Sequence, residues 1–308
     1  MPIKHLVISG GGANGIKSLG ILKELNDHQF WNIKDIKTIY STSAGSLISL
    51  LLLLENNLDT IINYILKRPW HEAFPLDISQ IFDIYKSKGL YANNITETFF
   101  KPFLDSKDLP LTITMRELFE YSGIELHVFS LEINEFKICD ISHITHPNLP
   151  ILTAIHMTIA IPIVISPVCL ENKCYIDGGM ISNYPLQYCL DQDPKPDITE
   201  ILGLRNHSHN EFNNINLESN IIEYLMHFTN KILYKVDTEL TQITIPNEVI
   251  FNSEYLSLQS LSNALYSVDV RKELFNNGIL VAKQFLENKN GDKVGDGDGD
   301  GKLYKEIP

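Results

Sequence analysis

The chain has few cysteines. Its 308 residues include four, Cys139, Cys169, Cys174 and Cys189, and they lie in the middle of the sequence without the spacing of metal ligands. This pattern excludes a metal site built from cysteines. We expect all four side chains to be reduced thiols, buried or half-buried in the protein core.

Long hydrophobic runs are also missing. The leucine run at residues 50–54 is ended by Glu55, and it is far shorter than the roughly 20 residues that a membrane-spanning helix needs. The first residues lead directly into a strand-like run, not into a secretory signal. These absences predict a cytoplasmic protein, soluble or peripherally bound to a membrane, with no signal peptide or transmembrane helix.

Positive charge is scarce as well. The sequence has 25 basic and 38 acidic residues, which gives a formal net charge of -13. Binding to nucleic acids is therefore disfavoured, because it depends on neutralising phosphates. The net negative charge also disfavours long-range attraction to an anionic membrane. We expect no nucleic-acid partner, and the sequence identifies no protein partner.

The composition is that of a globular protein, with 44% hydrophobic and 20% charged residues. The length is sufficient for one large α/β domain with helical additions. Residues 289–308, acidic and rich in Gly and Asp, are the exception and are expected to form a flexible tail. Asp296, Asp298 and Asp300 match the start of a calcium-binding loop, but its twelfth position is Ile307 instead of glutamate. The pattern therefore favours a solvated tail over a calcium site.

The first 54 residues predict two strand-helix units. Residues 5–9 are typical of a buried strand, and a helical pattern follows the next glycines at 16–25. A second strand at 37–40 leads into an apolar helix at 47–54. This order predicts a parallel sheet whose faces are covered by helices.

The rest of the chain contains both helical and strand-like segments. We expect helices at 58–66, 78–85, 94–103, 114–121, 151–161, 217–236 and 270–286, and strands at 127–131, 136–141, 173–176 and 198–204, the last being the final strand of the sheet. The helices between 58 and 122 contain many aromatic residues, among them Trp70, Phe74, Phe99 and Phe100. They predict either a cap that lines an apolar ligand site or an ordinary helical core.

A glycine-rich loop follows the first strand. Gly10, Gly12 and Gly15 have the spacing of a dinucleotide-binding fingerprint, which makes an NAD-dependent oxidoreductase one alternative. That fold also needs an acidic residue at the end of the second strand, where this chain has serine and threonine. The same glycines, with Gly11 and Ala13, are suited to presenting backbone N–H groups and a helix N-terminus to a developing negative charge.

Ser43 lies on a predicted sharp turn between the second strand and its helix. The segment Ser41-Thr42-Ser43-Ala44-Gly45 resembles a nucleophile elbow, in which small neighbours allow the turn to close. The usual pattern is G-x-S-x-G, and Ser41 replaces the first glycine. Such a turn makes a serine a candidate nucleophile if a base and N–H donors are nearby.

The candidate base for this serine is an aspartate. Asp177 follows a predicted strand and precedes Gly178 and Gly179. Alone, an aspartate in this position is usually a turn former or a helix cap. The histidines at positions 71, 127, 143, 146, 156, 207, 209 and 227 lie in no context that resembles a catalytic site. Because two other glycine-framed segments precede it, Asp177 is the better candidate.

Together these segments resemble the patatin-like phospholipases. Members of that family have a glycine-rich oxyanion loop, a serine elbow, an Asp-Gly-Gly or Asp-Gly-Ala motif, and a Ser-Asp dyad in place of a triad. Here the three motifs occupy residues 9–15, 41–45 and 177–185, and residues 154–167 are similar to the stretch that precedes the aspartate in the family. The resemblance extends from residue 5 to about residue 205.

The resemblance implies a fold, a domain organisation and an activity. The fold is α/β, with a parallel-rich central sheet covered by helices, related to the three-layer α/β-hydrolase fold, and with a helical cap and C-terminal helices. Residues 1–205 are then the catalytic domain, 206–288 a helical part of the same domain, and 289–308 the tail. The implied activity is hydrolysis of fatty acyl esters of glycerophospholipids or other lipids at a membrane, without a cofactor or metal ion.

The resemblance also implies roles for individual residues. Ser43 is the expected nucleophile and Asp177 the expected general base. The expected oxyanion hole consists of the backbone of Gly10, Gly11, Gly12, Ala13 and Gly15, and the two turns are supported by Ser41, Gly45, Gly178 and Gly179.

Two positions depart from the family pattern. Family members commonly carry Arg or Lys where Asn14 stands, although Lys17 is close by, and glycine where Ser41 stands. Neither departure removes the nucleophile, the base or the glycine amides, so an active enzyme is expected. A non-catalytic module that binds lipid is a further alternative, beside the oxidoreductase.

Overall fold

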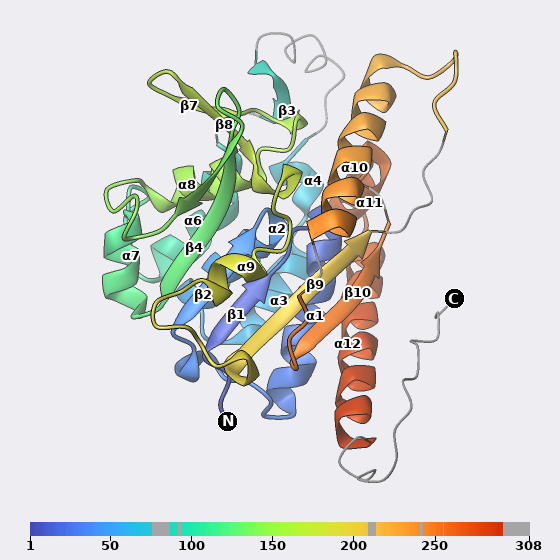
Figure 1. Ribbon diagram of the computed structural model, residues 1–308. Coiled ribbons are helices and arrows are strands. Elements are labelled where there is room, and N and C mark those ends of the chain that lie inside the picture. The colour runs from blue at the N-terminus through green and yellow to red at the C-terminus, as the bar shows by residue number, and fades with distance from the viewer. Residues whose placement is uncertain (76–86, 92–93, 209–213, 241–242, 255, 292–308) are drawn as a thin grey trace.

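A mixed β-sheet runs through the centre of the computed structural model (Figure 1), which describes residues 1–75, 87–91, 94–208, 214–240, 243–254 and 256–291. The described strands follow the order β10-β9-β1-β2-β4-β8-β7, and β5 also pairs with β4. Their bounds are β1 His5–Ile8, β2 Thr38–Thr42, β4 Glu125–Glu132, β5 Lys137–Ile141, β7 Val168–Leu170, β8 Lys173–Asp177, β9 Ile201–Ser208 and β10 Glu248–Ser253. Two short strands, β3 (Gly89–Tyr91) and β6 (Ile163–Ile165), pair separately.

The sheet has a parallel centre and an antiparallel extension. β1 pairs in parallel with β2 and β9, β2 with β4, and β9 with β10. β5 and β8 run antiparallel to β4, and β7 runs antiparallel to β8. The structure thus confirms the parallel-rich α/β fold that the strand-helix order predicts.

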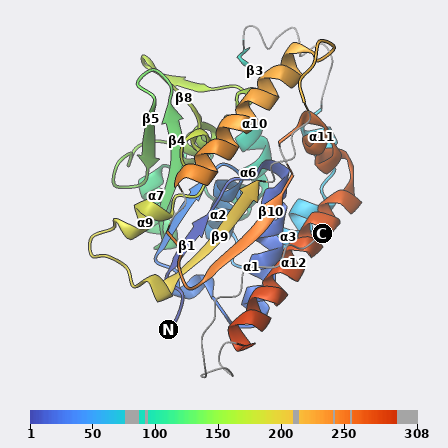
Figure 2. The ribbon, with the colours of Figure 1, turned by 45° about the vertical axis from the view of Figure 1, so that its right-hand side comes forward.

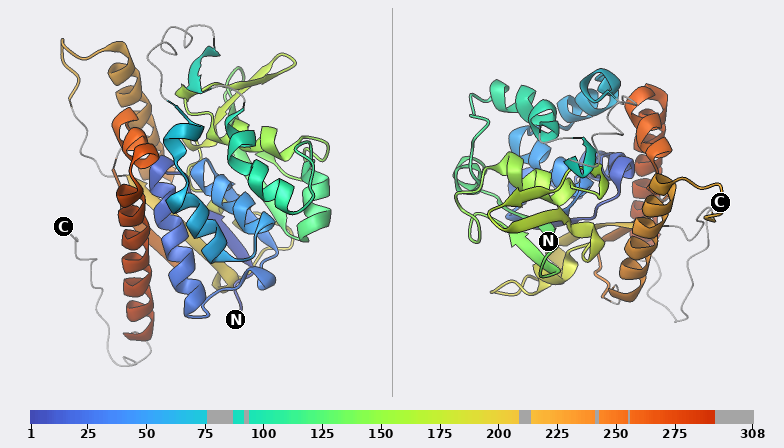
Figure 3. Two further views of the ribbon diagram at one scale, coloured as in Figure 1. Left: turned by 180° about the vertical axis from the view of Figure 1, so that it is seen from behind. Right: turned by 90° about the horizontal axis from the view of Figure 1, so that it is seen from above.

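Helices cover one face of the sheet (Figure 3, left). This layer contains α1 (Gly15–Asp27), α2 (Ala44–Leu54), α3 (Leu58–Lys67) and α12 (Val268–Gly291), and the remaining helices are α4 Trp70–Ala73, α6 Ile95–Ser106, α7 Met115–Ser122, α8 Ile151–Ile159, α9 Leu186–Leu190, α10 Ile221–Leu240 and α11 Leu258–Tyr266. The largest buried hydrophobic cluster lies under this layer and includes Leu6 and Ile8 of β1, whereas Val7 packs on the other face beside α9. Both faces of the central strands are therefore buried, as a parallel sheet requires.

The predicted segments differ from the structure mainly after residue 160. The strand expected to end the sheet, 198–204, is followed by a further edge strand, β10, and the expected helix at 217–236 begins at Ile221. The elements β3, β6, β7, α4, α9 and α11 lie in none of the expected segments. The helix expected at 78–85 and the calcium-loop pattern at 296–307 lie outside the described residues.

The prediction that all cysteines are reduced thiols is wrong for two of them. Cys169 and Cys174 form a disulfide, whereas Cys139 and Cys189 are free. The reason is the unpredicted strand β7, which forms a tight hairpin with β8 and places Cys169 directly opposite Cys174. Their Cα atoms are 4.1 Å apart, which is close enough for a covalent bridge between neighbouring strands.

A helix that crosses a membrane needs about 20 predominantly apolar residues. Within the ranges given above, every helix is either too short or too polar to cross a bilayer.

Candidate active site

The three glycine-framed motifs meet in space. The loop after β1, the turn after β2 and the end of β8 all contribute to one small cavity of about 50 Å3, whose lining includes Gly11, Gly12, Ser43, Asp177 and Gly179. β1 and β2 are parallel neighbours, so their carboxyl ends lie side by side. The backbone N–H of Gly10 donates to the carbonyl of Asn183 at 3.1 Å, which ties the first loop to the segment after Asp177.

Ser43 occupies a strained turn between β2 and α2. Its φ of 52° and ψ of -127° lie outside the regions that residues with side chains ordinarily adopt. The turn is held from two sides: the Ser43 N–H donates to Oγ1 of Thr158 at 2.9 Å, and a Cβ on Gly45 would lie 2.5 Å from the carbonyl oxygen of Ile8. Gly45 is therefore required for β1 and α2 to approach closely, as in a nucleophile elbow.

Ser41, the residue in place of the usual glycine, is fully buried within β2. It pairs with Ile8 of β1 on one side and with Val128 of β4 on the other. Among the described residues, none forms a hydrogen bond with Ser41 Oγ. The strand accommodates the extra hydroxyl without a partner, so the replacement leaves the turn in its expected form.

Asp177 ends β8 and is almost completely buried, with 4% of its surface exposed. Its Oδ1 accepts a hydrogen bond from the N–H of Gly179 at 2.7 Å. Burial raises the pKa of Asp177 to about 7, against the opposing effects of the Ser43 hydroxyl and the Gly179 amide. Oδ2, in contrast, has no hydrogen-bond partner of ordinary geometry in the described part of the chain. This oxygen is available to accept a proton, and catalytic hydrogen bonds are often loose before substrate binds.

The glycine loop lies at the N-terminus of α1. A short 3-10 turn at Gly12–Asn14 leads into that helix at Gly15, so the positive end of the helix dipole lies at this loop. Ala13, Gly12 and Gly15 also line a larger cavity beside Ser43. The loop and Ser43 therefore line the same two cavities.

Asn206 of β9 holds this loop in place, and none of the sequence motifs includes it. Its Nδ2 donates to the carbonyl of Gly10 at 3.0 Å, and its N–H donates to Oγ of Ser9 at 2.7 Å. The side chain is buried, and Oδ1 has no partner among the described residues. Asn206 is 196 residues away from Gly10 in the chain, so no local pattern could have linked the two.

Thr158 and Asn183 also hold the site in place, and both lie in segments that the sequence analysis identified. Thr158, which accepts from the Ser43 amide, donates to the carbonyl of Phe129. Asn183 lies between the loop and the aspartate turn, since a Cβ on Gly10 would be 2.5 Å and a Cβ on Gly179 3.1 Å from its Oδ1. Gly178, at the same turn, packs directly on the backbone of Phe129. These contacts hold the serine and aspartate motifs in fixed relative positions.

The larger cavity is apolar, and Ser43 is one of the residues that line it. It has a volume of about 230 Å3, and its walls come from α1, α2, α4, α6 and the segment around β6. Trp70, Phe74 and Phe99 line it, whereas Phe100 is buried in the main hydrophobic core. The aromatic residues between 58 and 122 therefore serve both purposes considered for them, as the wall of an apolar site and as core.

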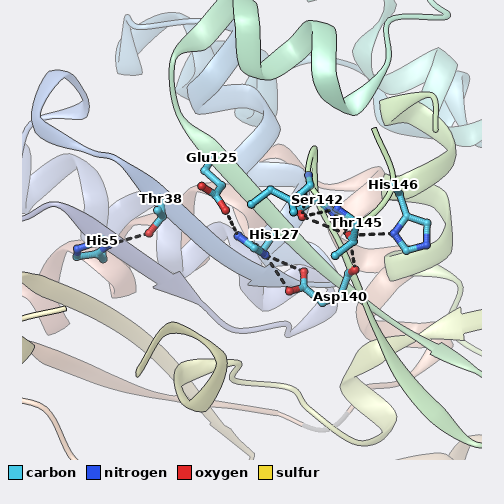
Figure 4. Close-up of polar contacts among 9 residues, drawn as sticks. His5, Thr38, Glu125, His127, Asp140, Ser142, Thr145 and His146 are labelled. Atoms are coloured by element: carbon cyan, nitrogen blue, oxygen red, sulfur yellow. Dashed lines mark hydrogen bonds and ion pairs between the residues drawn. The ribbon is translucent and has the colours of Figure 1, made fainter. Parts of the chain in front are cut away.

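No histidine among the described residues lines either cavity. His127 lies elsewhere on β4, where Nδ1 contacts Asp140 at 2.8 Å and Nε2 contacts Glu125 at 2.7 Å (Figure 4). Burial opposes its charged form, but the two carboxylates outweigh burial and raise the pKa of His127 to about 9. The ring also stacks on Tyr40, with 4.4 Å between ring centroids. This group is a structural ion cluster, separate from the serine.

A metal site needs several ligand side chains close together in space. Within the described ranges, no three His, Cys, Asp or Glu side chains are arranged so that they could hold a metal ion.

Comparisons with known proteins agree with this geometry. A family model for patatin-like phospholipases matches residues 6–190. A protein of Invertebrate iridescent virus 6, named "Probable lipid hydrolase 463L", is 28% identical over 189 residues, which are 61% of this chain and 63% of that protein. This match spans less than two thirds of the length of that relative.

Two further similarities cover nearly the whole chain. An uncharacterized protein of Acanthamoeba polyphaga mimivirus is 25% identical over 293 residues, which are 92% of this chain and 93% of that protein. The crystal structure of VipD from Legionella pneumophila superimposes with a TM-score of 0.55 at 16% identity, over 93% of this chain and 67% of that one, and this likeness shows a shared fold. Because the family model matches more than half of its residues, the chain belongs to the patatin-like phospholipase family.

Proposed function

We propose that the chain is a lipid acyl hydrolase of the phospholipase A type, which cleaves fatty acyl esters of glycerophospholipids with Ser43 and Asp177. One observation carries the proposal. A serine in a strained turn and a buried aspartate with one unpaired oxygen line the same cavity, and that serine also lines a larger apolar cavity. Membership of a phospholipase family and the lipid hydrolase relative support the class of substrate.

In the proposed reaction, Ser43 Oγ attacks the ester carbonyl carbon while Asp177 Oδ2 takes the hydroxyl proton. The carbonyl oxygen becomes an oxyanion, which the N–H groups of Gly11, Gly12 and Ala13 stabilise. When the C–O bond of the ester breaks, Asp177 gives its proton to the leaving alkoxide. Water then attacks the acyl-enzyme while Asp177 takes a proton from it. When the bond between the acyl carbon and Ser43 Oγ breaks, Asp177 returns this proton to Oγ, so that the fatty acid is released and free Ser43 and ionised Asp177 are restored.

The raised pKa of Asp177 supports its role as the base. An ordinary aspartate is a weak base at neutral pH, and proton transfer is most efficient when the pKa is close to the operating pH. With a pKa of about 7, the carboxyl accepts a proton readily and is still ionised above neutrality. Hydrolysis is therefore expected to increase with pH through about 7 and then level off.

The apolar cavity is the proposed site of the fatty acyl chain. Trp70, Phe74 and Phe99 line it together with Ser43, so in the proposed complex the acyl chain lies against the aromatic residues and its ester carbonyl lies next to the serine. Burial of methylene groups in this cavity is worth about 0.8 kcal/mol each. Long-chain esters are accordingly the proposed substrates.

Labelling with a fluorophosphonate, followed by mapping of the modified residue, tests the proposal. The wild-type chain is expected to be labelled on Ser43 and to release fatty acid from phospholipid vesicles. Ser43→Ala should lose both properties. Ser46→Ala is the matched control, because Ser46 is a buried serine on the next turn whose Oγ has no partner among the described residues. Turnover in Ser43→Ala, or vesicle binding without any product in the wild type, would contradict a serine hydrolase.

A further inference from the structure

Helix α10 has an inner face that belongs to the candidate active site. Met226, Thr229 and Asn230 are buried on this face. Asn230 fixes the helix, because its Nδ2 donates to the carbonyl of Leu256 at 2.6 Å and its Oδ1 accepts from the N–H of the same residue at 2.9 Å. Asn230 and Leu233 line the cavity that contains Ser43 and Asp177. The helix is therefore one wall of the site.

The opposite face of α10 is exposed and apolar. Ile221 is 67% exposed, Phe228 57%, and Tyr224 and Leu225 are also exposed. Their spacing of three and four residues places all four on one side of the helix. Figures 1 and 2 show α10 on the outside of the molecule, rising beyond the ends of β9 and β10. Leu217, in the segment that leads into the helix, adds a fully exposed side chain.

Two lysines continue the same face. Lys231 and Lys235 are exposed and follow Phe228 and Tyr224 at helical spacing. Helix α10 contains three acidic residues. Glu223 lies on another side of the helix, where its carboxylate accepts from the N–H of Asn220, and Asp237 and Glu239 follow the lysines in the chain. We name this surface the outer face of α10, consisting of Ile221, Tyr224, Leu225, Phe228, Lys231 and Lys235. It combines aromatic and aliphatic side chains with positive charge in a chain whose net charge is -13.

This combination distinguishes the outer face from single exposed hydrophobic residues elsewhere. Such residues are normal on protein surfaces, and Phe136, 61% exposed in the turn between β4 and β5, is one. Its neighbours in the chain include the acidic residue Glu135. The outer face of α10 instead has four large apolar side chains within two helical turns and no acidic residue among them.

We propose that the outer face of α10 docks on a lipid bilayer that contains anionic headgroups. Aromatic and aliphatic side chains enter the boundary between headgroups and acyl chains, while lysines contact anionic lipids, as in interfacial amphipathic helices. A protein partner fits this surface less well, because lysine is depleted at the centre of protein interfaces. The inference rests on the proposed function, since docking through α10 brings the cavity behind it to the surface where its substrate resides.

Sedimentation with vesicles tests the proposal, using phosphatidylcholine alone and a mixture with one fifth phosphatidylserine. Phe228→Ser is expected to weaken binding to the mixed vesicles at least tenfold, because a Phe side chain leaves an apolar environment. Phe136→Ser, the matched control with the same residue type and similar exposure, should bind like the wild type. Lys231→Gln together with Lys235→Gln should weaken binding to the mixed vesicles severalfold and leave binding to phosphatidylcholine unchanged.

Hydrolysis of a short, water-soluble ester separates docking from chemistry. Phe228→Ser should cleave this ester at the wild-type rate and lose rate on vesicles only. If the wild type fails to cleave any ester, the proposed function fails, whereas the vesicle measurements still decide the docking. Equal vesicle binding by Phe228→Ser and the wild type, or equal loss in Phe136→Ser, would overturn the proposal. A change from dimer to monomer in Phe228→Ser with unchanged vesicle binding would also overturn it and assign the face to a second copy of the chain.

Discussion

Strand β4 connects two buried ionisable centres that are built in opposite ways. His127 lies near its beginning, and both ring nitrogens contact carboxylates. Further along, Ser130 of the same strand pairs with Asp177, whose Oδ2 has no hydrogen-bond partner among the described residues. At His127 both ring nitrogens have a partner, whereas at Asp177 only Oδ1 accepts a hydrogen bond of ordinary geometry. We call the first the paired centre and the second the half-paired centre. Buried polar groups are usually paired in folded proteins, so the unpaired oxygen of Asp177 is an exception that lowers the stability of the fold.

Both centres have raised pKa values, yet the consequences for stability differ in sign. For His127, the pKa of about 9 means that the folded state favours the charged form, so the contribution is full below about pH 6.5 and is lost as pH rises through about 9. For Asp177, the pKa of about 7 means that the folded state disfavours the charged form. Its ionisation therefore destabilises the fold increasingly from about pH 4 to about pH 7.

The largest expected effect is on catalysis at the half-paired centre. Asp177→Asn should lower the rate of ester hydrolysis at pH 8 by about 10^3-fold or more, because an amide does not accept the serine proton. Steady-state kinetics on a soluble ester measure this. The corresponding change at the paired centre, Asp140→Asn, should leave the rate within about twofold. Comparable losses in the two variants would remove the distinction between the centres.

The same Asp177→Asn variant is expected to be more stable than the wild type at high pH. The amide keeps an acceptor for the Gly179 N–H and carries no buried charge. The free energy of unfolding should therefore increase by up to about 4 kcal/mol above pH 7. The gain should disappear near pH 4, where the wild-type carboxyl is protonated in both states. Urea unfolding at pH 5 and pH 8 measures the difference, and a variant that is less stable at both values would contradict the assignment of an unfavourable buried charge.

Close packing around the glycine loop predicts the next effect. A Cβ on Gly11 would lie 2.5 Å from Nδ2 of Asn206, which is buried and already hydrogen-bonded to the loop. Gly11→Ala should therefore displace the loop and reduce the rate about 100-fold, a loss typical of a disturbed oxyanion hole. Gly123→Ala is the control, because that glycine has positive φ but open space around it. It should cost about 1 kcal/mol of stability and no activity.

The smallest expected effect is at the paired centre. His127→Gln should destabilise the fold by about 2 kcal/mol at pH 6, a value reduced to allow for the partial exposure of both carboxylates. The loss should become smaller as pH rises towards 9, with esterase activity unchanged. Thermal unfolding across this pH range measures it, and His28→Gln, at an exposed position after α1, should change stability by less than about 0.5 kcal/mol. A loss that is independent of pH would argue against an ion cluster.

Local sequence patterns predicted the parts of the site that are local. The glycine loop, the Ser43 turn and the Asp177 turn each depend on a few consecutive small residues, so their form could be expected from the sequence. The residues next to Ser41 could not be predicted from its local sequence, because they lie in two other strands, β1 and β4. Asn206 and Asn230 lie in a strand and a helix without any distinctive local pattern, and only the packing of β9 and α10 brings them to the loop.

The strands that the sequence analysis missed include β10 and β7, at the two ends of the strand order. β10 alternates buried and exposed residues, and its exposed positions include the polar Asn252 and the apolar Ile250, so its pattern is weak beside the uniformly buried β1 and β2. β7 is three residues long, and short strands depend on a partner instead of their own composition. Without β7 in view, Cys169 and Cys174 had no visible reason to pair.

The position of β1 has a consequence for the synthesis of this protein. β1 lies between β2, which follows it closely in the chain, and β9, which is made about 160 residues after β2. A nascent chain that has reached residue 200 already contains Ser43 and Asp177 but lacks the strand whose Asn206 fixes the glycine loop. The centre of the sheet is completed only when β9 leaves the ribosome. While residues 178–205 are being made, a growing chain therefore contains both Ser43 and Asp177, but its glycine loop still lacks Asn206.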